Sequence, residues 1–213
     1  MSRDSGPQCK ECRSSGMKLY LKGDRCYIDD KCSVKRRPYP PGHLGRVSRR
    51  DRNASEYSVQ LKEKQRARRM YGLSEVQFRR YYESAASKRG ITGEILFQTL
   101  ERRLDNVVYR LGFGASRRNA RQLVRHRHIK VNGKIVDIPS YQVSANDLIE
   151  VKESSKKLQL VRDAADSGSR RGRIPAWLET NPLELKGTVL ELPMGDKLDI
   201  PVESHLIVEF YSR

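Results

Sequence analysis

The sequence has no long apolar run. No stretch of its 213 residues approaches the roughly 18 consecutive apolar residues that a membrane-spanning helix needs. The opening residues, MSRDSGPQCK, lack the apolar core of a secretory signal, and neither end carries a lipidation motif. The sequence therefore predicts a cytoplasmic protein with no membrane partner.

Acidic residues are scarce relative to basic ones. The chain has 26 aspartates and glutamates against 43 lysines and arginines, which gives a formal net charge of +17. One explanation of this excess is that it merely keeps the protein soluble. However, mutual repulsion of like charges opposes a compact fold, which argues against that explanation. We therefore expect a polyanionic partner, and nucleic acid is the first candidate.

The motifs of common enzyme sites are also missing. The sequence has no glycine-rich loop of the kind that cradles phosphates, and His126, His128 and His205 have no neighbouring Ser, Cys or Asp motif that would make them catalytic bases. The paired histidine–glutamate and cysteine motifs of zinc deaminases are absent as well. The sequence therefore predicts a protein that is not an enzyme and has no small-molecule substrate.

All four cysteines lie near the start of the chain. Cys9 and Cys12 are separated by two residues, thirteen residues follow, and five residues separate Cys26 from Cys32. Four thiolates on short turns form a closed tetrahedral set, so the spacing predicts a metal knuckle with one structural zinc ion. An iron–sulfur cluster and free thiols are the alternatives. His43 lies well past Cys32 in a proline-rich stretch and is not expected to be a ligand.

The first half of the chain after the cysteines reads as a linker and two helices. Prolines and glycines make the stretch RRPYPPGHLGRVSRRDRN an extended basic linker. A helix is expected from Ser55 to Gly72, and a second from Ser74, which has capping-box spacing to Gln77, to Gly90. Tyrosines in the second helix could stack on bases, but their helical spacing favours a core position.

Leucines and valines at helical spacing predict one long helix from Gly93 to Gly112. Ser116 then caps a further helix, in which Arg117, Arg121 and Arg125 recur every four residues. Like charges at this interval repel each other, so their arrangement suggests phosphate binding.

Alternating apolar residues mark the segments that follow. HIKV and KIVDI flank Asn132 and Gly133, a hairpin signal, and DLIEV is a further strand. A helix is expected over residues 155–165, a loop over DSGSRRGRIP, and a strand in TVLELP. Periodicity does not decide whether the tail HLIVEFY is helix or strand.

The string RRLDNVVYRLGFGASRRNARQLVRHRHIKVNGKIVDIPSYQV, residues 102–143, closely resembles the RNA-binding domain of the family of small-subunit ribosomal protein four. The flanking stretches RRPYPPG, YSVQLKEKQRARRMYG and HLIVEFYSR resemble the same family, so the resemblance covers almost the whole chain. It implies an α+β fold with a knuckle and linker over residues 1–45, a mainly helical domain from 46–94 plus 166–213, and an inserted RNA-binding domain over 95–165, in which a helix pair accompanies short antiparallel strands.

The resemblance also implies function and partners. It predicts a structural constituent of the small ribosomal subunit that binds small-subunit rRNA, nucleates assembly of the subunit body, contacts ribosomal protein five, supports translational accuracy and lines the channel where messenger RNA enters. The metal ligands expected are Cys9, Cys12, Cys26 and Cys32. The RNA-binding residues expected are Arg36, Arg37, Arg46, Arg49, Arg50, Arg66, Arg69, Arg103, Arg110, Arg117, Arg118, Arg121, Arg125, His128, Lys130, Asn132 and Lys134.

Two other functions compete with this one. A free-standing RNA-binding regulator could carry the same domain, although it would lack the full set of flanking matches. An RNA-modifying enzyme could also borrow the domain, but the roughly 110 residues outside the motif domain and the tail are too few for a catalytic domain. The insertion-like stretch RVSRRDRN departs from the family pattern, which leaves open which arginines of the linker reach RNA.

Overall fold

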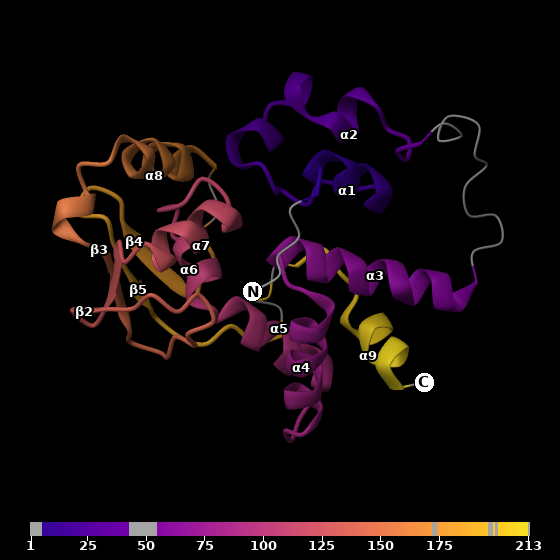
Figure 1. The fold of residues 1–213 in the computed structure, drawn as a ribbon. Coiled ribbons are helices and arrows are strands. Elements are labelled where there is room, and N and C mark those ends of the chain that lie inside the picture. Colours follow the sequence, from indigo (N-terminus) through magenta and orange to yellow (C-terminus); the bar gives the residue numbers. More distant parts are fainter. Residues whose placement is uncertain (1–5, 43–54, 172–173, 196–197, 199, 213) are drawn as a thin grey trace. The chain divides into compact units, whose positions relative to one another are not determined.

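The computed structural model describes residues 6–42, 55–171, 174–195, 198 and 200–212, without the side chains of residues 169–171. It forms two compact units, Met1–Gly93 with Pro201–Arg213 and Glu94–Ile200 (Figure 1). The expected division placed all of residues 166–213 in the first domain. Residues 166–200 instead belong to the second unit, because two strands within them pair with the sheet of that unit.

The first unit opens with the cysteine-containing segment. It consists of the helix α1 (Gln8–Ser15), the 3-10 turns η1 (Gly23–Cys26) and η2 (Asp29–Lys31), and the short helix α2 (Ser33–Arg36). Gly16 ends α1 in the left-handed conformation that glycine adopts without strain. The buried apolar side chains in this segment are Cys12, Leu19 and Cys32, which make a very small core.

Among its described residues, the first unit also contains the helices α3 (Glu56–Tyr71), α4 (Glu75–Ala86) and α9 (Ser204–Ser212). The predicted cap of α4 is confirmed, since the Ser74 hydroxyl accepts a hydrogen bond from the backbone N–H of Gln77. Ser55, where the first helix was expected to begin, caps α3 in the same way by accepting from Ser58 N–H. The C-terminal tail, which periodicity left undecided, is the helix α9. The Tyr82 ring stacks on Tyr211 of α9 with 4.5 Å between ring centroids, which supports its interpretation as a packing residue.

The prediction of one long helix over residues 93–112 is wrong. The segment is divided into α5 (Thr92–Glu101) and α6 (Leu104–Arg110), and Arg103 between them has an extended backbone. Backbone pairing with a distant segment causes the break: Leu104 N–H donates to Tyr141 O at 2.9 Å, and Val143 N–H donates to Arg102 O at 3.0 Å. These long-range bonds override a helical pattern that is continuous in the sequence.

The second unit contains an antiparallel sheet in the order β2-β1-β3-β5-β4. Its strands are β1 (Ile129–Val131), β2 (Lys134–Ile135), β3 (Leu148–Val151), β4 (Leu178–Asn181) and β5 (Lys186–Val189). The predicted hairpin turn is confirmed, because Asn132 and Gly133 both have positive φ angles, of 49° and 77°.

Helices pack on one face of this sheet. They are α6, α7 (Arg117–Arg125) and α8 (Gln159–Arg171), and their apolar residues form one core with the inward side chains of the strands (Figure 1). The 3-10 turn η4 (Glu153–Ser155) lies between β3 and α8. The expected mixture of a helical domain and a small antiparallel sheet is thus confirmed.

The loop expected over residues 166–175 is corrected, since α8 continues to Arg171. Gly168 lies inside this helix and is in close contact with the backbone of Gly112. A Cβ atom at Gly168 would come within 2.9 Å of the Gly112 Cα atom. Here glycine permits close packing and does not end the helix.

Candidate nucleic-acid interface and cysteine cluster

The helix α7 presents the arginines that the sequence singled out. Its first turn is capped by the Ser116 hydroxyl, which accepts from Asn119 N–H, while the Asn119 side chain accepts from Ala115 N–H at 3.1 Å. Ala120, Leu123 and Val124 are buried in the core of the second unit. One face of α7 is therefore fixed against the core, and its polar face carries the arginines.

Two of the predicted RNA-binding arginines share the buried carboxylate of Asp105. Arg103 binds it with both arms of its guanidinium group, at 3.0 Å and 2.7 Å, and Arg121 donates to one of its oxygen atoms at 3.2 Å. The Arg103 side chain is only 3% exposed, whereas that of Arg121 is 17% exposed. Arg103 therefore lies outside the candidate interface, because its charge is compensated inside the fold.

A second buried acid supports two more arginines. Glu101 accepts two hydrogen bonds from Arg110, both at 3.0 Å, and one from the Asn106 amide at 2.9 Å. The Asn106 oxygen in turn accepts from Arg117 Nε at 2.8 Å, and the Arg117 guanidinium lies 4.6 Å from the centre of the Tyr109 ring. Arg110 and Arg117 are both partly exposed, and these hydrogen bonds orient their guanidinium groups.

Arg118 and Arg125 complete the basic side of α7, where Arg118 is partly exposed and Arg125 is exposed. On the hairpin, Lys134 is exposed, but the Asn132 amide bridges Asp147 at 2.8 Å and Leu148 N–H at 2.9 Å. The Asn132 side chain therefore fixes the turn.

His128 is partly buried, and its Nδ1 atom lies 2.8 Å from the Ser155 hydroxyl. Burial lowers the pKa of His128, and the nearby charges of His126 and Lys152 lower it further. The uncharged form is therefore favoured, and its expected contact with RNA would be a hydrogen bond.

The outer face of the sheet carries charges of both signs. Lys130, Glu150 and Lys186 lie side by side on β1, β3 and β5. Lys186 forms an ion pair with Glu184 at 2.8 Å, and that hydrogen bond raises the pKa of Lys186. Lys156 likewise pairs with Glu153 at 2.6 Å. Lys130 lies opposite Glu150 on the neighbouring strand, whose negative charge makes it a weaker candidate for phosphate binding than the exposed Lys134.

In the first unit, Arg36 and Arg37 are exposed at the end of α2. Arg66 has internal partners, since its guanidinium donates to Ser15 O at 2.9 Å and forms an ion pair with Glu63. Arg69 donates to the Ser14 hydroxyl at 3.0 Å. These two predicted RNA-binding residues of α3 therefore bind the end of α1.

The predicted Arg46, Arg49 and Arg50, together with His43, lie outside the described residues.

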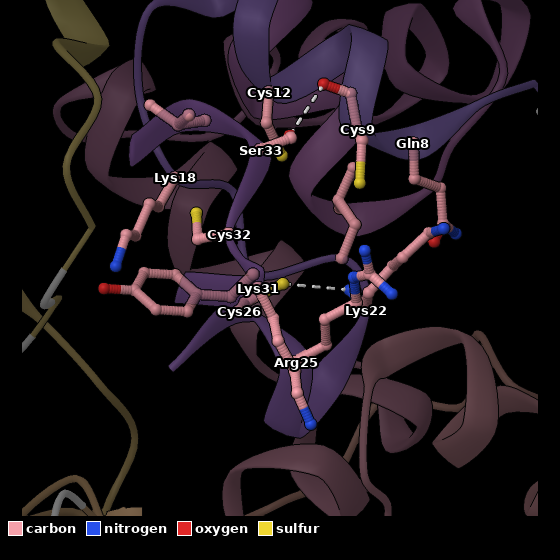
Figure 2. Close-up of a pocket in the computed structure, with 13 residues that line it drawn as sticks. Gln8, Cys9, Cys12, Lys18, Lys22, Arg25, Cys26, Lys31, Cys32 and Ser33 are labelled. Atoms are coloured by element: carbon pink, nitrogen blue, oxygen red, sulfur yellow. Dashed lines mark hydrogen bonds between the residues drawn. The ribbon is translucent and has the colours of Figure 1, made fainter. Parts of the chain in front are cut away.

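The four cysteines line one pocket in the first unit, which Figure 2 shows together with Lys18, Lys22 and Lys31. Two sulfur atoms accept backbone hydrogen bonds: Cys12 from Leu19, and Cys26 from Lys22 at 3.3 Å. Burial raises the pKa of Cys12 to about 11, and the charges of the other three thiolates also raise it. Burial also raises the pKa of Cys26, so that without a cation the Cys12 and Cys26 thiols are held in the neutral form.

The donor chemistry of this cluster fits a soft metal ion, because four thiols and two N–H donors to sulfur surround a single pocket. Within the described part of the chain, however, no three Cys, His, Asp or Glu side chains already stand in an arrangement that could hold a metal ion. The sulfur atoms would have to turn toward one another to bind one.

Sequence reasoning missed two buried acids and one arginine that binds two backbone oxygens. Asp105 and Glu101 looked like ordinary helix charges, although their place among arginines in ERRLDN was an available signal. Arg13 was not singled out either. Its guanidinium donates to Tyr39 O and Pro40 O, both at 3.0 Å, and so ties the proline-rich stretch to α1.

Comparisons with known proteins cover the whole chain. Residues 3–101 match the family model of the ribosomal protein S4/S9 N-terminal domain, and residues 102–149 match that of the S4 domain. The chain is 55% identical to small ribosomal subunit protein uS4A of Symbiobacterium thermophilum, 54% to uS4 of Desulforamulus reducens and 52% to uS4 of Thermus thermophilus. Each comparison covers 213 residues and 100% of both chains. Among the described residues, no helix is long and apolar enough to span a membrane.

Proposed function

Since the chain belongs to the uS4 family of small ribosomal subunit proteins, we infer that it is a structural constituent of the small ribosomal subunit and binds rRNA through its S4 domain. The observation that carries this conclusion is identity above 50% along the full length of several family members. These relatives are named as ribosomal proteins, not as enzymes, which agrees with the expectation of a non-catalytic role.

We propose that the arginine side of α6 and α7 forms the main rRNA contact. Guanidinium groups bind phosphate oxygens with two parallel hydrogen bonds, so a set of oriented arginines recognises the position of phosphates in a folded RNA. Double-stranded RNA is recognised mainly by its shape, and reading of bases is a minor part. The proposed contacts are Arg110, Arg117, Arg118, Arg121, Arg125 and Lys134, with Arg36 and Arg37 of the first unit and, from sequence alone, Arg46, Arg49 and Arg50.

The family resemblance supports further roles as proposals. The chain would be a primary rRNA-binding protein that nucleates assembly of the subunit body, contacts ribosomal protein five, contributes to translational accuracy and lines the channel where messenger RNA enters. Cross-linking in assembled subunits tests the two contacts, since each predicts a specific cross-linked product. Subunits that assemble at the normal rate without this chain would contradict the nucleating role.

We also propose that Cys9, Cys12, Cys26 and Cys32 hold one structural zinc ion. A bound zinc ion would cross-link a segment that has little apolar core of its own. Four sulfur ligands would leave no open coordination position for a substrate. An iron–sulfur cluster is the alternative. Metal analysis is expected to give about one zinc per chain and a colourless protein. A brown protein with iron would support the alternative, and four titratable thiols without metal would overturn both proposals.

Co-sedimentation tests the main proposal. The chain is expected to remain with small subunits after a high-salt wash, whereas a free-standing regulator would be released.

The affinity for isolated rRNA should fall as the salt concentration rises, with a log–log slope of about 0.7 to 0.9 per phosphate contact. The variant Arg125→Gln should reduce this slope by roughly one contact, while the matched change Arg127→Gln, at a residue paired with Asp137, should reduce it less. An affinity that does not depend on salt would contradict the proposed interface.

A further inference from the structure

The buried Asp105 carboxylate is an unusual feature in a chain with a large excess of positive charge. It lies at the start of α6 with 8% of its side chain exposed and accepts from both Arg103 and Arg121. Burying an ion pair costs desolvation energy, and the attraction between the two charges often does not exceed this cost. A buried ion pair is therefore weak evidence that the pair stabilises the fold. Its contribution is better sought in the orientation of the groups that it binds.

The two arginines use Asp105 in different ways. Arg103 is buried, and its guanidinium group donates one hydrogen bond to each oxygen atom of the carboxylate, through Nε and Nη2. Arg121 donates through Nη1 alone and is partly exposed on the polar face of α7. An arginine has five N–H donors, so Arg121 keeps donors beyond the one that Asp105 accepts.

Glu101 repeats the arrangement for the neighbouring arginines. It holds Arg110 with two hydrogen bonds, and through Asn106 it orients Arg117. The side chains of Asp105 and Glu101 therefore lie beneath partly exposed arginines of the proposed interface, at two separate points. By contrast, Arg127 forms its ion pair with Asp137 on the surface, where the two side chains are 71% and 42% exposed.

We infer that Asp105, and by the same arrangement Glu101, is a positioning residue that fixes the guanidinium groups of the α6–α7 face before RNA binds. This inference rests on the proposed rRNA-binding function. Immobilising a flexible side chain upon binding weakens the complex, and a side chain that is already fixed avoids this loss. The carboxylates thus favour an RNA whose phosphates match the fixed arginines over an RNA that offers only negative charge.

A double substitution with no change in net charge tests this role. Arg103→Met with Asp105→Asn removes the buried pair together, which avoids leaving one buried charge without its partner. Arg121 keeps its charge and loses its support. The matched control is Arg127→Gln with Asp137→Asn, which removes an exposed pair and is also neutral in net charge.

The expected result is a loss of selectivity. For the Arg103→Met/Asp105→Asn variant, affinity for a folded fragment of small-subunit rRNA should fall about tenfold, since loosening one or two arginines costs that order of free energy. Its affinity for an unrelated RNA of equal length, and the salt slope, should stay close to the wild-type values. Circular dichroism and thermal unfolding would show that the variant is folded, and the control should keep wild-type affinity for both RNAs.

Other outcomes separate the two proposals. If the wild-type chain does not prefer the rRNA fragment, the proposed function fails. If it does prefer that fragment but the double variant binds as tightly as the wild type, or more tightly, Asp105 does not position Arg121 for RNA and the inference is overturned.

A second measurement needs no substitution and so does not depend on the folding of a variant. In the free wild-type chain, ¹⁵N relaxation of the arginine Nε–H groups should show Arg121 to be rigid on the picosecond-to-nanosecond timescale and the exposed Arg125 to be mobile. Equal mobility of the two groups would overturn the inference.

Discussion

The cysteine-containing segment, residues 6–42, and the second unit, residues 94–200, are stabilised by different means. The segment buries few apolar side chains, and its described contacts include hydrogen bonds from Arg13 and Arg66 to backbone oxygens. The second unit has one continuous core that joins three helices to a five-stranded sheet. Both present arginines to solvent. The second unit holds the buried acids Glu101 and Asp105 next to its arginines, whereas no acid is buried within the described residues 6–42. A basic surface in this chain can therefore rest on a segment tied by hydrogen bonds to backbone oxygens or on apolar packing.

The largest expected effect follows from removal of the proposed metal. Chelation, or the substitution Cys32→Ser, should unfold residues 6–42 because zinc binding contributes about 10 to 16 kcal/mol to the folding of zinc-finger peptides. Hydrogen exchange should show loss of protection in α1 and α2 and unchanged protection in β1 and β3. Ser33→Ala is the control, since Ser33 lines the same pocket without a thiol. Retained protection in the Cys32→Ser variant would show that the segment folds without the metal.

A change in the core of the second unit should have the next largest effect. Leu123→Ala should lower the free energy of unfolding by about 2 to 5 kcal/mol, because Leu123 is 3% exposed and its removal leaves a cavity. Chemical denaturation with circular dichroism detection measures the change. Leu183→Ala is the matched control at a 96% exposed position, where the expected change is within about 0.5 kcal/mol. Equal effects of the two substitutions would contradict the described core.

Helix caps should have similar effects in the two units, which sharpens the comparison. Ser74→Ala in the first unit and Ser116→Ala in the second should each cost about 1 kcal/mol, because each hydroxyl accepts one backbone N–H at 3.3 Å. Thermal unfolding of the two variants provides the measurement. Ser87→Ala is the control, because its hydroxyl donates to a carbonyl near the end of α4 and caps no N-terminus. A much larger effect at one cap would show that the helices of that unit depend more on local bonds.

The parts of the fold that could be predicted from the sequence depend on local chemistry. The caps at Ser74 and Ser116 and the turn at Asn132-Gly133 were predicted correctly, because each depends on bonds within a few residues. The break near Arg103 and the continuation of α8 past Gly168 were missed. Both depend on segments that are far away in the sequence, so periodicity carries no information about them.

The candidate site depends on both kinds of information. The residue types on α7 indicated phosphate binding, but side-chain burial decides which arginine remains available. Arg103 and Arg121 look equivalent in the sequence, yet Arg103 is enclosed and Arg121 is partly exposed, because the helix break at residues 102–103 turns Arg103 inward toward Asp105. Tertiary structure, and not residue type, separates the two roles.

The smallest expected effect concerns acid stability of the first unit. Burial raises the pKa of Glu75, but hydrogen bonds from Lys64 and Tyr211, with the charges of Lys64 and Arg68, outweigh it and lower the pKa below the usual 4.5. A lowered pKa in the folded state stabilises the fold above pH 4.5, and this contribution is lost as the pH falls through the folded-state value. The Glu75→Gln variant should therefore show a flatter decline in stability below pH 4.5 than the wild type.

The Glu75 effect should be smaller than that of a cap, since the Glu75 side chain is 45% exposed and solvent screens its ion pairs. Glu83→Gln, at the more exposed Arg79–Glu83 pair, is the control and should leave the pH profile close to that of the wild type. Denaturation curves from pH 3 to 7 are the measurement. If the stability of the Glu75→Gln variant declined as steeply as that of the wild type, the hydrogen bonds that join α9 to α4 would add no acid sensitivity. The first unit would then resemble the second unit in depending on apolar packing.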